Sequence, residues 1–310
     1  MKNFTKPRLN NNLTPWQVTG FTDGEGSFTY SITKSNPTKY KLSLEFKVTQ
    51  KSHSEGVLYE LQEYFGCGSV VIDNRKTDTK KFHTSSLEAI LTKIIPHFNL
   101  YPCITSKHLN YKDWEKIALM MDRKEHLNSA GMLEILNITS QMNTQRSFAD
   151  KYNYCVSALG MSLDTSGQIL VQYDLPVDWV QGFLTGEGLF YIYFDGTNVQ
   201  PSLELGQNSH DVAILLALKK FFNGGYIKPK YNFSDLVECQ NSRSVNRFIL
   251  RNTETIINNV EQHPMLTRKH LDYVDWKKVV EIKNKGLHKT SDGLTLIKEI
   301  LSKMNSKRDS

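Results

Sequence analysis

The sequence predicts an α+β protein made of two similar domains. The main observation is a duplication: residues 16–28, which have the pattern of a helix end, a glycine-flanked glutamate and a strand, are repeated at residues 179–190. An offset of 162 residues separates Glu25 from its copy, Glu187. A chain of 310 residues is long enough for two mid-sized cores. Length and duplication together indicate two domains with the same order of helices and strands.

The first element is a helix with a clear start. Thr14 supplies a side-chain cap, and Pro15 occupies the first helical position, where proline is favoured. We expect the helix to run through Phe21 and to end within residues 24–26.

Glycines give this helix and its copy a smooth face. Gly20 and Gly24 are four residues apart, as are Gly182 and Gly186, so each pair lies on one side of its helix. A face without side chains lets another backbone approach closely. We expect the two helices to pack through these faces, which would bring the two glutamates side by side.

Alternation of apolar and polar residues predicts strands at 28–33 and 41–49, and again at 190–194 and 202–205. One face of each sheet should therefore be apolar and covered by helices. The other face should be a polar surface rich in hydrogen-bonding groups.

The other elements of the first half follow in order, and the second half repeats them. Ser52 and Glu55 have capping-box spacing, which predicts a helix from Ser52 to Phe65. Beyond it we expect strands at 69–73 and 80–85 around a turn at 77–78, a helix at 87–95, a break at Tyr101 and Pro102, a helix that opens at Lys107, and a last helix at 130–143.

The repeat also sets the domain boundaries. We expect an N-terminal domain at residues 1–143 and a C-terminal domain at residues 175–310. The segment between them, residues 144–174, contains Ser, Asp and Gln and has mixed character, so we expect a linker.

Composition narrows the class of protein only partly. The 38 basic and 32 acidic residues give a net charge of +6, which fits a polyanionic partner without requiring one. The four cysteines are isolated, which disfavours a zinc site and indicates a reducing compartment. No apolar run approaches the ~20 residues needed to cross a bilayer. Residues 1–12 lack a signal-type core or an Arg-rich presequence, so we expect the protein to act where it is made.

The two nonapeptides at residues 18–26 and 180–188 resemble the LAGLIDADG motif. One such nonapeptide would be a weak signal, but two in matching helix–strand–strand–helix contexts are a strong one. The chain is similar to single-chain, two-repeat LAGLIDADG homing endonucleases of organellar group I introns. This resemblance implies αββαββα halves about a pseudo-twofold axis. The motif helices would lie at the centre, and two four-stranded antiparallel sheets would form a saddle over DNA.

The resemblance also implies an activity, a divalent-metal-dependent nuclease that cuts both strands of a long site in double-stranded DNA during intron homing. Two sheets end to end span on the order of 60–70 Å, or about 20 bp. Because one chain carries both halves, we expect a monomer. The mitochondrion is the expected location, with the chloroplast as an alternative. The competing function is a group I intron RNA maturase with weak or no DNA cleavage.

Glu25 and Glu187 are the candidate catalytic and metal-binding carboxylates. Each is expected at the end of a helix, where the dipole disfavours an anion, and two adjacent carboxylates repel each other. A hard divalent cation would remove both penalties, and oxygen ligands suit Mg²⁺. By resemblance the metal site includes Gly24 and Gly186, and Ca²⁺ should support binding without cleavage. The alternative is a pair of surface glutamates at turns.

Four more residues are catalytic candidates by resemblance. Lys107 and Lys269 each follow a proline by five residues and match the family's active-site lysine; the alternative is a solvated lysine at a helix start. Gln50 and Gln207 end the second strand of each half and match a position that holds active-site water. Strict alternation puts Gln50 on the apolar face, so the strand must break there or the assignment must be wrong.

The two motif copies differ at their sixth position, which is Asp23 in the first and Thr185 in the second. The loss of an acid beside one active site could weaken the cut of one strand. It could equally be neutral at a helix interface, and the sequence leaves both outcomes open.

The candidate DNA-binding residues lie on the polar face of the strands, where they could contact base edges, or are lysines placed to contact phosphates. The sets from the two halves differ, which indicates an asymmetric DNA site. The candidates are Thr29, Ser31, Thr33, Lys34, Ser43, Glu45, Lys47 and Lys80 in the first half, and Tyr191, Tyr193, Ser202, Glu204, Lys228 and Lys230 in the second.

Overall fold

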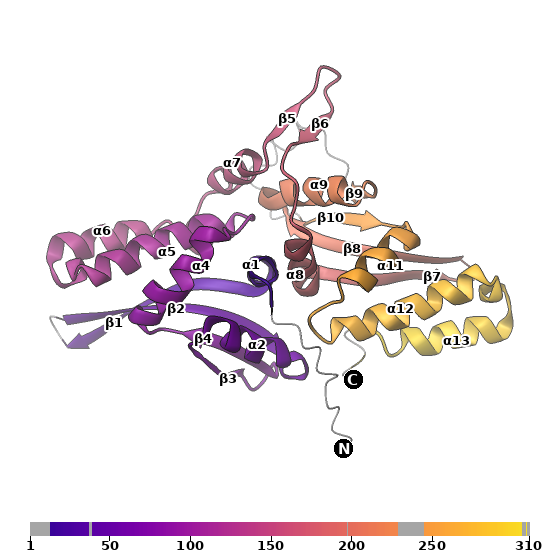
Figure 1. Ribbon diagram of the computed structural model, residues 1–310, viewed down its shortest axis with the longest axis horizontal. Coiled ribbons are helices and arrows are strands. Elements are labelled where there is room, and N and C mark those ends of the chain that lie inside the picture. The colour runs from indigo at the N-terminus through magenta and orange to yellow at the C-terminus, as the bar shows by residue number, and fades with distance from the viewer. Residues whose placement is uncertain (1–12, 37–38, 197, 229–244, 306–307, 309–310) are drawn as a thin grey trace.

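The computed structural model describes residues 13–36, 39–196, 198–228, 245–305 and 308. Two lobes lie on either side of a central helix pair, α1 (Pro15–Glu25) and α8 (Val177–Glu187) (Figure 1). Each lobe combines one four-stranded antiparallel sheet with helices. The predicted α+β class and the two similar domains are therefore confirmed.

The first lobe contains the elements that the sequence predicts, with a sheet in the order β1-β2-β4-β3. Its elements after α1 are β1 (Gly26–Asn36), β2 (Lys39–Lys51), a 3-10 turn (Ser52–Ser54), α2 (Gly56–Phe65), β3 (Ser69–Asn74), β4 (Thr79–Thr84), α3 (Leu87–Ala89), a π-helical turn (Ile90–Ile94), α4 (Ile95–Leu100), α5 (Lys107–Asp122), a 3-10 turn (Glu125–Leu127), α6 (Ser129–Thr139) and a 3-10 turn (Asn143–Gln145).

The second lobe repeats this order, and its sheet has the matching order β7-β8-β10-β9. Its elements after α8 are β7 (Gly188–Asp195), β8 (Asn198–Asn208), a 3-10 turn (Ser209–Asp211), α9 (Val212–Phe221), β9 (Tyr226–Lys228), β10 (Val245–Leu250), α11 (Thr253–Gln262), α12 (Lys269–Asn284), a 3-10 turn (Leu287–Lys289) and α13 (Ser291–Leu301).

The helix predicted at 87–95 continues to Leu100 through the π-helical turn. Pro96 lies in its path and has no amide hydrogen to donate to the preceding turn, so a wider turn just before it keeps the helix continuous. The capping box predicted at Ser52 is wrong: Ser52 starts a 3-10 turn, and α2 begins only at Gly56. The amide of Ser52 instead donates to the carbonyl of Asp78, in the turn between β3 and β4.

The segment expected as a linker has structure of its own. It contains helix α7 (Phe148–Ala158) and a hairpin of β5 (Met161–Leu163) and β6 (Ile169–Val171), which rises above the two lobes in Figure 1. The Tyr154 hydroxyl donates to the Cys103 carbonyl of the first lobe at 3.1 Å, whereas the neighbouring Cys155 donates to Asp211 of the second lobe. Helix α7 therefore contacts both lobes.

Each lobe has its own apolar core between its sheet and its helices. Phe28, Phe46 and Trp114 are fully buried in the first, and Phe190 and Trp276 take corresponding places in the second. The burial of alternate residues on β1, β2 and β7 agrees with the predicted alternation. No helix in the described part of the chain is long and apolar enough to cross a membrane.

Candidate active site at the domain interface

The central helices touch through their glycines, as predicted. A Cβ atom on Gly20 would lie 2.1 Å from the carbonyl oxygen of Trp179, and one on Gly182 would lie 2.3 Å from the carbonyl oxygen of Gln17. Only glycine permits this approach of two backbones. One turn further on, a Cβ atom on Gly186 would lie 3.2 Å from Cγ of Glu25. The helix ends that carry the two glutamates therefore meet at the interface.

Glu25 and Glu187 are half-buried and surrounded by charged groups. Burial raises the pKa of both carboxyl groups, and the charge of Glu25 raises the pKa of Glu187 further. Hydrogen bonds from Gln50 to Glu25 and from Gln207 to Glu187 act in the opposite direction, as do the charges of the two nearby lysines. The two carboxylates are therefore desolvated, close in space and only partly compensated by the protein.

Lys107 and Lys269 are the first residues of α5 and α12, and each reaches back to the end of its motif helix. Lys107 Nζ donates to the carbonyl of Thr22 at 2.7 Å and to that of Gly26 at 2.6 Å. Lys269 Nζ donates to the carbonyl of Gly186 at 2.6 Å. The Gly186 carbonyl lies in the last turn of α8, where carbonyls have no partner within the helix. Both lysines place a cation at the negative end of a helix dipole.

Burial lowers the pKa of both lysines. The pKa of Lys269 falls to about 8, although Glu25 and Glu187 act to raise it. Lys107 has the charge of Asp23 beside it in addition to the glutamates. The two lysines thus hold equivalent places in unequal electrostatic surroundings.

The structure explains why Gln50 breaks the alternation rule. Strand β1 begins at Gly26, which pairs with Val48, so the last residues of β2 extend past the end of β1. Gln50 stays within β2, opposite Lys80 of β4, and its side chain bonds Glu25 instead of entering the core. The strand therefore does not break at this residue.

The sixth position of the motif lies at the helix interface. Asp23 is buried, and its carboxylate accepts bonds from the amides of Ile104 at 2.8 Å and Thr105 at 3.4 Å, and from the indole Nε1 of Trp179 at 2.8 Å. Thr185 is buried too, and its hydroxyl accepts a bond from the amide of Leu266 at 3.2 Å. Asp23 thus holds the loop that precedes α5, and Thr185 holds the loop that precedes α12.

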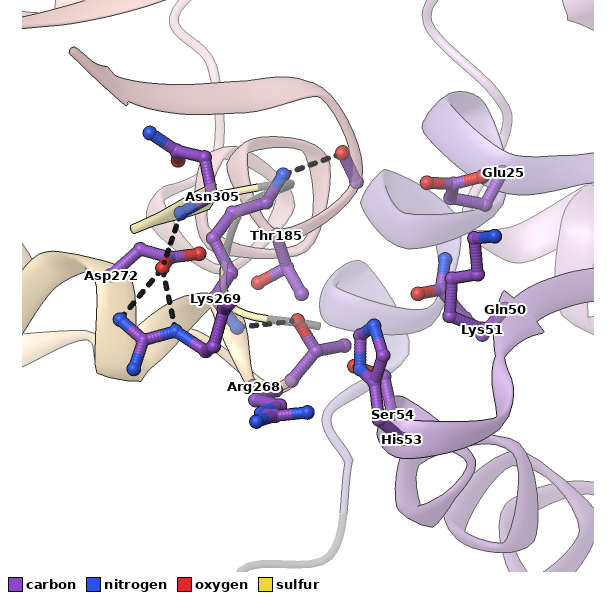
Figure 2. Close-up of a pocket in the computed structure, with 13 residues that line it drawn as sticks. Glu25, Gln50, Lys51, His53, Ser54, Thr185, Arg268, Lys269, Asp272 and Asn305 are labelled. Atoms are coloured by element: carbon purple, nitrogen blue, oxygen red, sulfur yellow. Dashed lines mark hydrogen bonds and ion pairs between the residues drawn. The ribbon is translucent and has the colours of Figure 1, made fainter. Parts of the chain in front are cut away.

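A cleft of about 260 Å³ opens beside Glu25 and is lined by residues of both lobes. Figure 2 shows Glu25 and Gln50 on one side, and Lys269, Arg268 and Asp272 on the other. A substrate in this cleft would contact both domains at once.

The polar face of the first sheet carries most of its predicted residues in accessible positions. On this face Ser31 and Thr33 are exposed, and Thr29, Ser43, Glu45 and Lys47 are half-buried. Lys34 and Lys80 have the parity of the buried Phe28 and Phe82 in their strands, so they lie on the side of the sheet that the helices cover; Lys34 is exposed there and Lys80 is half-buried. Two of the charged residues have partners: Lys80 pairs with Glu55, and Glu45 pairs with Lys81 at 2.8 Å.

The second sheet differs from expectation. Tyr191 and Tyr193 are 39% and 42% exposed, and Lys228 is also exposed. The exposure expected for Ser202 and Glu204 is wrong, because these side chains are only 2% and 6% exposed. They share the polar face with the tyrosines but lie beneath larger neighbours, including Arg247, which pairs with Glu204 at 3.2 Å. Lys230 lies outside the described residues.

Several side chains on these faces were not predicted from the sequence. Lys81 and His83 of β4 border Glu45, and Arg247, Arg251 and Gln200 line a cleft of about 410 Å³ with the two tyrosines. The alternation of residues along β4 and β10 could have predicted them. Lys81 and Arg247 each precede a phenylalanine that is fully buried, so they lie on the opposite, polar face.

The candidate active-site residues of both domains lie in segments that match a known family. A family profile described as LAGLIDADG endonuclease matches residues 18–118 and, a second time, residues 180–280. The chain belongs to the LAGLIDADG endonuclease family. The resemblance drawn from the two nonapeptides is thereby confirmed. The first match begins within α1 and ends within α5, and the second begins within α8 and ends within α12.

Among curated proteins, the chain is 31% identical to "Probable intron-encoded endonuclease 2" of Neurospora crassa over 303 residues, which cover 93% of this chain and 64% of the relative. It is 26% identical to "Probable intron-encoded endonuclease 3" of the same fungus, over 94% of this chain and 54% of the relative. It is 24% identical to "Uncharacterized mitochondrial protein RF1" of Saccharomyces cerevisiae, over 99% of this chain and 63% of that protein. The chain thus spans between half and two thirds of the length of these relatives.

Solved structures give the same fold. The LAGLIDADG homing endonuclease I-GzeII in complex with its DNA target has a TM-score of 0.77 and 27% identity, over 96% of this chain and 99% of that one. I-SmaMI, bound to an uncleaved DNA target in the presence of calcium ions, has a TM-score of 0.77 and 25% identity, over 94% and 99% of the two chains.

Proposed function

We propose that this chain is a site-specific DNA endonuclease that cuts both strands of a long, asymmetric duplex by metal-assisted phosphodiester hydrolysis, as in intron homing. The observation that carries the proposal is the meeting of two desolvated glutamates, one from each domain, at the abutting ends of the motif helices. A lysine from the same domain lies beside each of them. Family membership and the DNA targets bound by the neighbouring structures support the same conclusion.

The donors at the interface fit Mg²⁺. Glu25 and Glu187 are carboxylates that burial and mutual repulsion make unfavourable as bare anions, and the carbonyls of Gly24 and Gly186 lie in the same helix turns. Within the described residues no group of three or more His, Cys, Asp or Glu side chains could hold a metal ion. A site with so few protein ligands suits Mg²⁺, which keeps waters and takes phosphate oxygens from the substrate. When bound, the metal would supply Lewis-acid polarisation of the scissile phosphate.

We assign the remaining roles to side chains that already face the two glutamates. Lys107 and Lys269 carry positive charge next to the position of the scissile phosphate, where it would offset negative charge that develops during hydrolysis. Gln50 and Gln207 bond the carboxylates and have a second polar atom available to orient a water molecule. Each domain thus contributes one glutamate, one lysine and one glutamine.

The sheets supply the DNA-binding surface in this proposal. A ribbon of strands fits the major groove, and two sheets end to end span about 20 bp. The net charge of +6 would favour encounter with a polyanion. Because both active-site halves lie in one chain, a monomer is sufficient. We place the protein in the mitochondrion, as one relative is named mitochondrial and others are named as intron-encoded fungal proteins.

The test is a cleavage selection on a library of randomised duplexes. We expect double-strand cuts in Mg²⁺, binding without cutting in Ca²⁺, and no cutting by Glu25→Gln or Glu187→Gln in Mg²⁺. Glu88→Gln, at an exposed position of α3, is the matched control and should cut normally. Full cleavage by both active-site variants would overturn the metal-ligand assignment.

The selection also separates the endonuclease from the RNA maturase. If no duplex is cut and the protein binds a group I intron RNA tightly, the maturase is the better description. The presence of both glutamates favours the enzyme, because an RNA-binding splicing helper has no need of two desolvated carboxylates at this junction.

A further inference from the structure

Asp211 is a buried carboxylate of the second domain that contacts the first domain. It ends the 3-10 turn between β8 and α9 and is only 7% exposed. Its carboxylate accepts bonds from the amide of Ser106 at 2.9 Å and from the Ser106 hydroxyl at 3.1 Å. Cys155 of α7 donates to the same carboxylate at 2.9 Å, and His210 Nε2 lies 3.2 Å from it. Three segments that are distant in the sequence therefore meet at this carboxylate.

The contact falls immediately before an active-site lysine. The amides of Ile104 and Thr105 donate to Asp23 of the first domain, and the next amide, of Ser106, donates to Asp211 of the second. The following residue is Lys107, where α5 begins. Two carboxylates from opposite domains thus hold three successive amides of the loop.

The environment of Asp211 favours a permanent negative charge. Burial acts to raise the pKa of its carboxyl group, but His210 and the bonds from Cys155 and Ser106 outweigh burial, and the pKa is lowered. An anion at the start of α5 also interacts favourably with the positive end of that helix. The negative charge of Asp211 therefore strengthens its bonds to Ser106 and is favourable beside the first turn of α5.

We propose that Asp211 is a positioning residue for Lys107, through which the second domain fixes the lysine of the first domain at the shared active site. The inference rests on the proposed endonuclease function. The backbone of Lys107 follows directly on Ser106, and its ammonium group bonds the carbonyls of Thr22 and Gly26. A shift of Ser106 would therefore move the Lys107 backbone and disturb these bonds.

The other half of the molecule has no carboxylate at the equivalent position. Ser54 stands in the place of Asp211, because it follows His53 as Asp211 follows His210, and Arg268 precedes Lys269 as Ser106 precedes Lys107. Ser54 offers a hydroxyl where Asp211 offers a carboxylate, and the Ser54 hydroxyl bonds His53 Nδ1 at 2.9 Å. Loss of Asp211 should therefore impair one active-site half more than the other.

The test is a single-turnover cleavage assay on a target duplex labelled separately on each strand. We expect Asp211→Asn to slow the strand that Lys107→Met also slows, by roughly 10- to 100-fold, the range that follows from a misplacement of about 1 Å. The other strand should be cut at nearly the wild-type rate, so that nicked duplex accumulates, and binding in Ca²⁺ should be unchanged. Equal slowing of both strands, or no slowing, would overturn the proposal.

Asp164→Asn is the matched control. Asp164 also accepts several bonds from a loop, including those from the amides of Ser166 and Gln168 at 2.8 Å, but it lies in the exposed turn of the β5–β6 hairpin. Its substitution should leave both cutting rates unchanged. If Asp211→Asn does not fold, Ser106→Ala removes only the hydroxyl donor and should give the same strand preference in weaker form.

Hydrogen exchange gives a readout that does not depend on cleavage. In Asp211→Asn the amide of Ser106 should exchange faster than in the wild type, whereas amides in the core of α12 should not change. Unchanged exchange at Ser106 would contradict the positioning contact. If wild-type protein cuts no duplex but exchange at Ser106 rises in the variant, the proposed function fails while the contact stands.

Discussion

The indole Nε1 of Trp179 donates a 2.8 Å hydrogen bond to the carboxylate of Asp23, across the interface between the two motif helices. The acid in the sixth motif position is thereby bound to the partner helix and to the loop before Lys107. In the first copy of the motif, the position that matches Trp179 is Gln17, whose amide bonds Gln181 at 2.7 Å. At the sixth position of the second copy, Thr185 replaces the carboxylate, and the facing helix carries Gln17 where α8 carries the indole of Trp179.

This relationship predicts that Thr185→Asp will destabilise the protein and will not improve cleavage. The Thr185 hydroxyl donates to the carbonyl of Gln181 at 2.8 Å and accepts from the amide of Leu266, and a carboxylate cannot make the first of these bonds. The cost should be about 1–3 kcal/mol in the free energy of unfolding, measured with urea, because a buried charge faces a carbonyl oxygen. Thr185→Ser keeps the hydroxyl and is the control. A stabilised Thr185→Asp variant with faster cleavage would show that the missing acid matters at the active site.

The glycine contact between α1 and α8 predicts a stability effect that is independent of activity. In Gly182→Ala the new methyl group would lie 2.3 Å from the carbonyl oxygen of Gln17, which belongs to the backbone of the facing helix. The helices must separate, and overpacking of this kind costs about 1–3 kcal/mol. Gly224→Ala is the matched control, because its nearest neighbour would be 3.7 Å away. Equal melting temperatures for the two variants would contradict the close packing.

The duplication made this interface predictable from the sequence. Glycines at a spacing of four, found twice, indicate two helices that face each other, and Lys107 and Lys269 could be located because their surroundings repeat. Features that occur in only one half of the chain were not predicted from the sequence. Helix α7 lies in the segment with no repeat, and Asp211 contacts Ser106 across 105 residues, a separation that local patterns do not report.

Alternation predicted which face a strand residue occupies but not how far its neighbours cover it. Ser202 and Glu204 lie on the expected face of β8 and are nonetheless buried, because side chains of adjacent strands extend over them. Alternation was equally misleading for Gln50, which it places on the apolar face. Because β1 begins at Gly26, opposite Val48, the end of β2 at Gln50 extends past β1, and the side chain contacts Glu25 instead of the core. Both outcomes depend on sheet register, which follows from tertiary pairing.

Buried His97 predicts a loss of stability at acid pH. Its ring nitrogens contact the hydroxyls of Thr19 and Tyr64 at 3.1 and 3.0 Å, and burial lowers its pKa to about 3. Below pH ~6.5 the unfolded chain binds a proton that the folded chain does not, so the free energy of unfolding falls as the pH decreases towards the folded pKa. The contribution is at most about 1.4 kcal/mol per pH unit.

Urea unfolding at several pH values between 7.5 and 4.5 measures this effect. Because other groups also titrate, the comparison is with His97→Gln, which has no proton to bind in this range. The stability gap between the wild type and the variant should shrink as the pH falls. A constant gap would show that His97 binds a proton in the folded protein as readily as in the unfolded chain.

Arg247 is the side chain that we expect to read a base in the second half of the DNA site. It lies on the polar face of β10, more than half exposed, while its partner Glu204 is buried and also accepts a bond from the Ser202 hydroxyl at 3.1 Å. The buried carboxylate holds the guanidinium in one orientation, as bidentate recognition of guanine requires. Arg247→Ala should therefore weaken binding in Ca²⁺ by about 1–3 kcal/mol, with the loss confined to one G·C pair.

The measurement is the binding constant for a set of duplexes in which each base pair of the site is changed in turn. Arg123→Ala is the matched control, because Arg123 is exposed, pairs with Glu125 and lies at the far end of α5 from Lys107. Glu204→Gln should reproduce part of the Arg247→Ala effect, since it frees the guanidinium without removing it. If Arg247→Ala instead weakens binding to all duplexes equally and lowers the salt dependence by about one unit, Arg247 contacts a phosphate and specificity at this position comes from its neighbours.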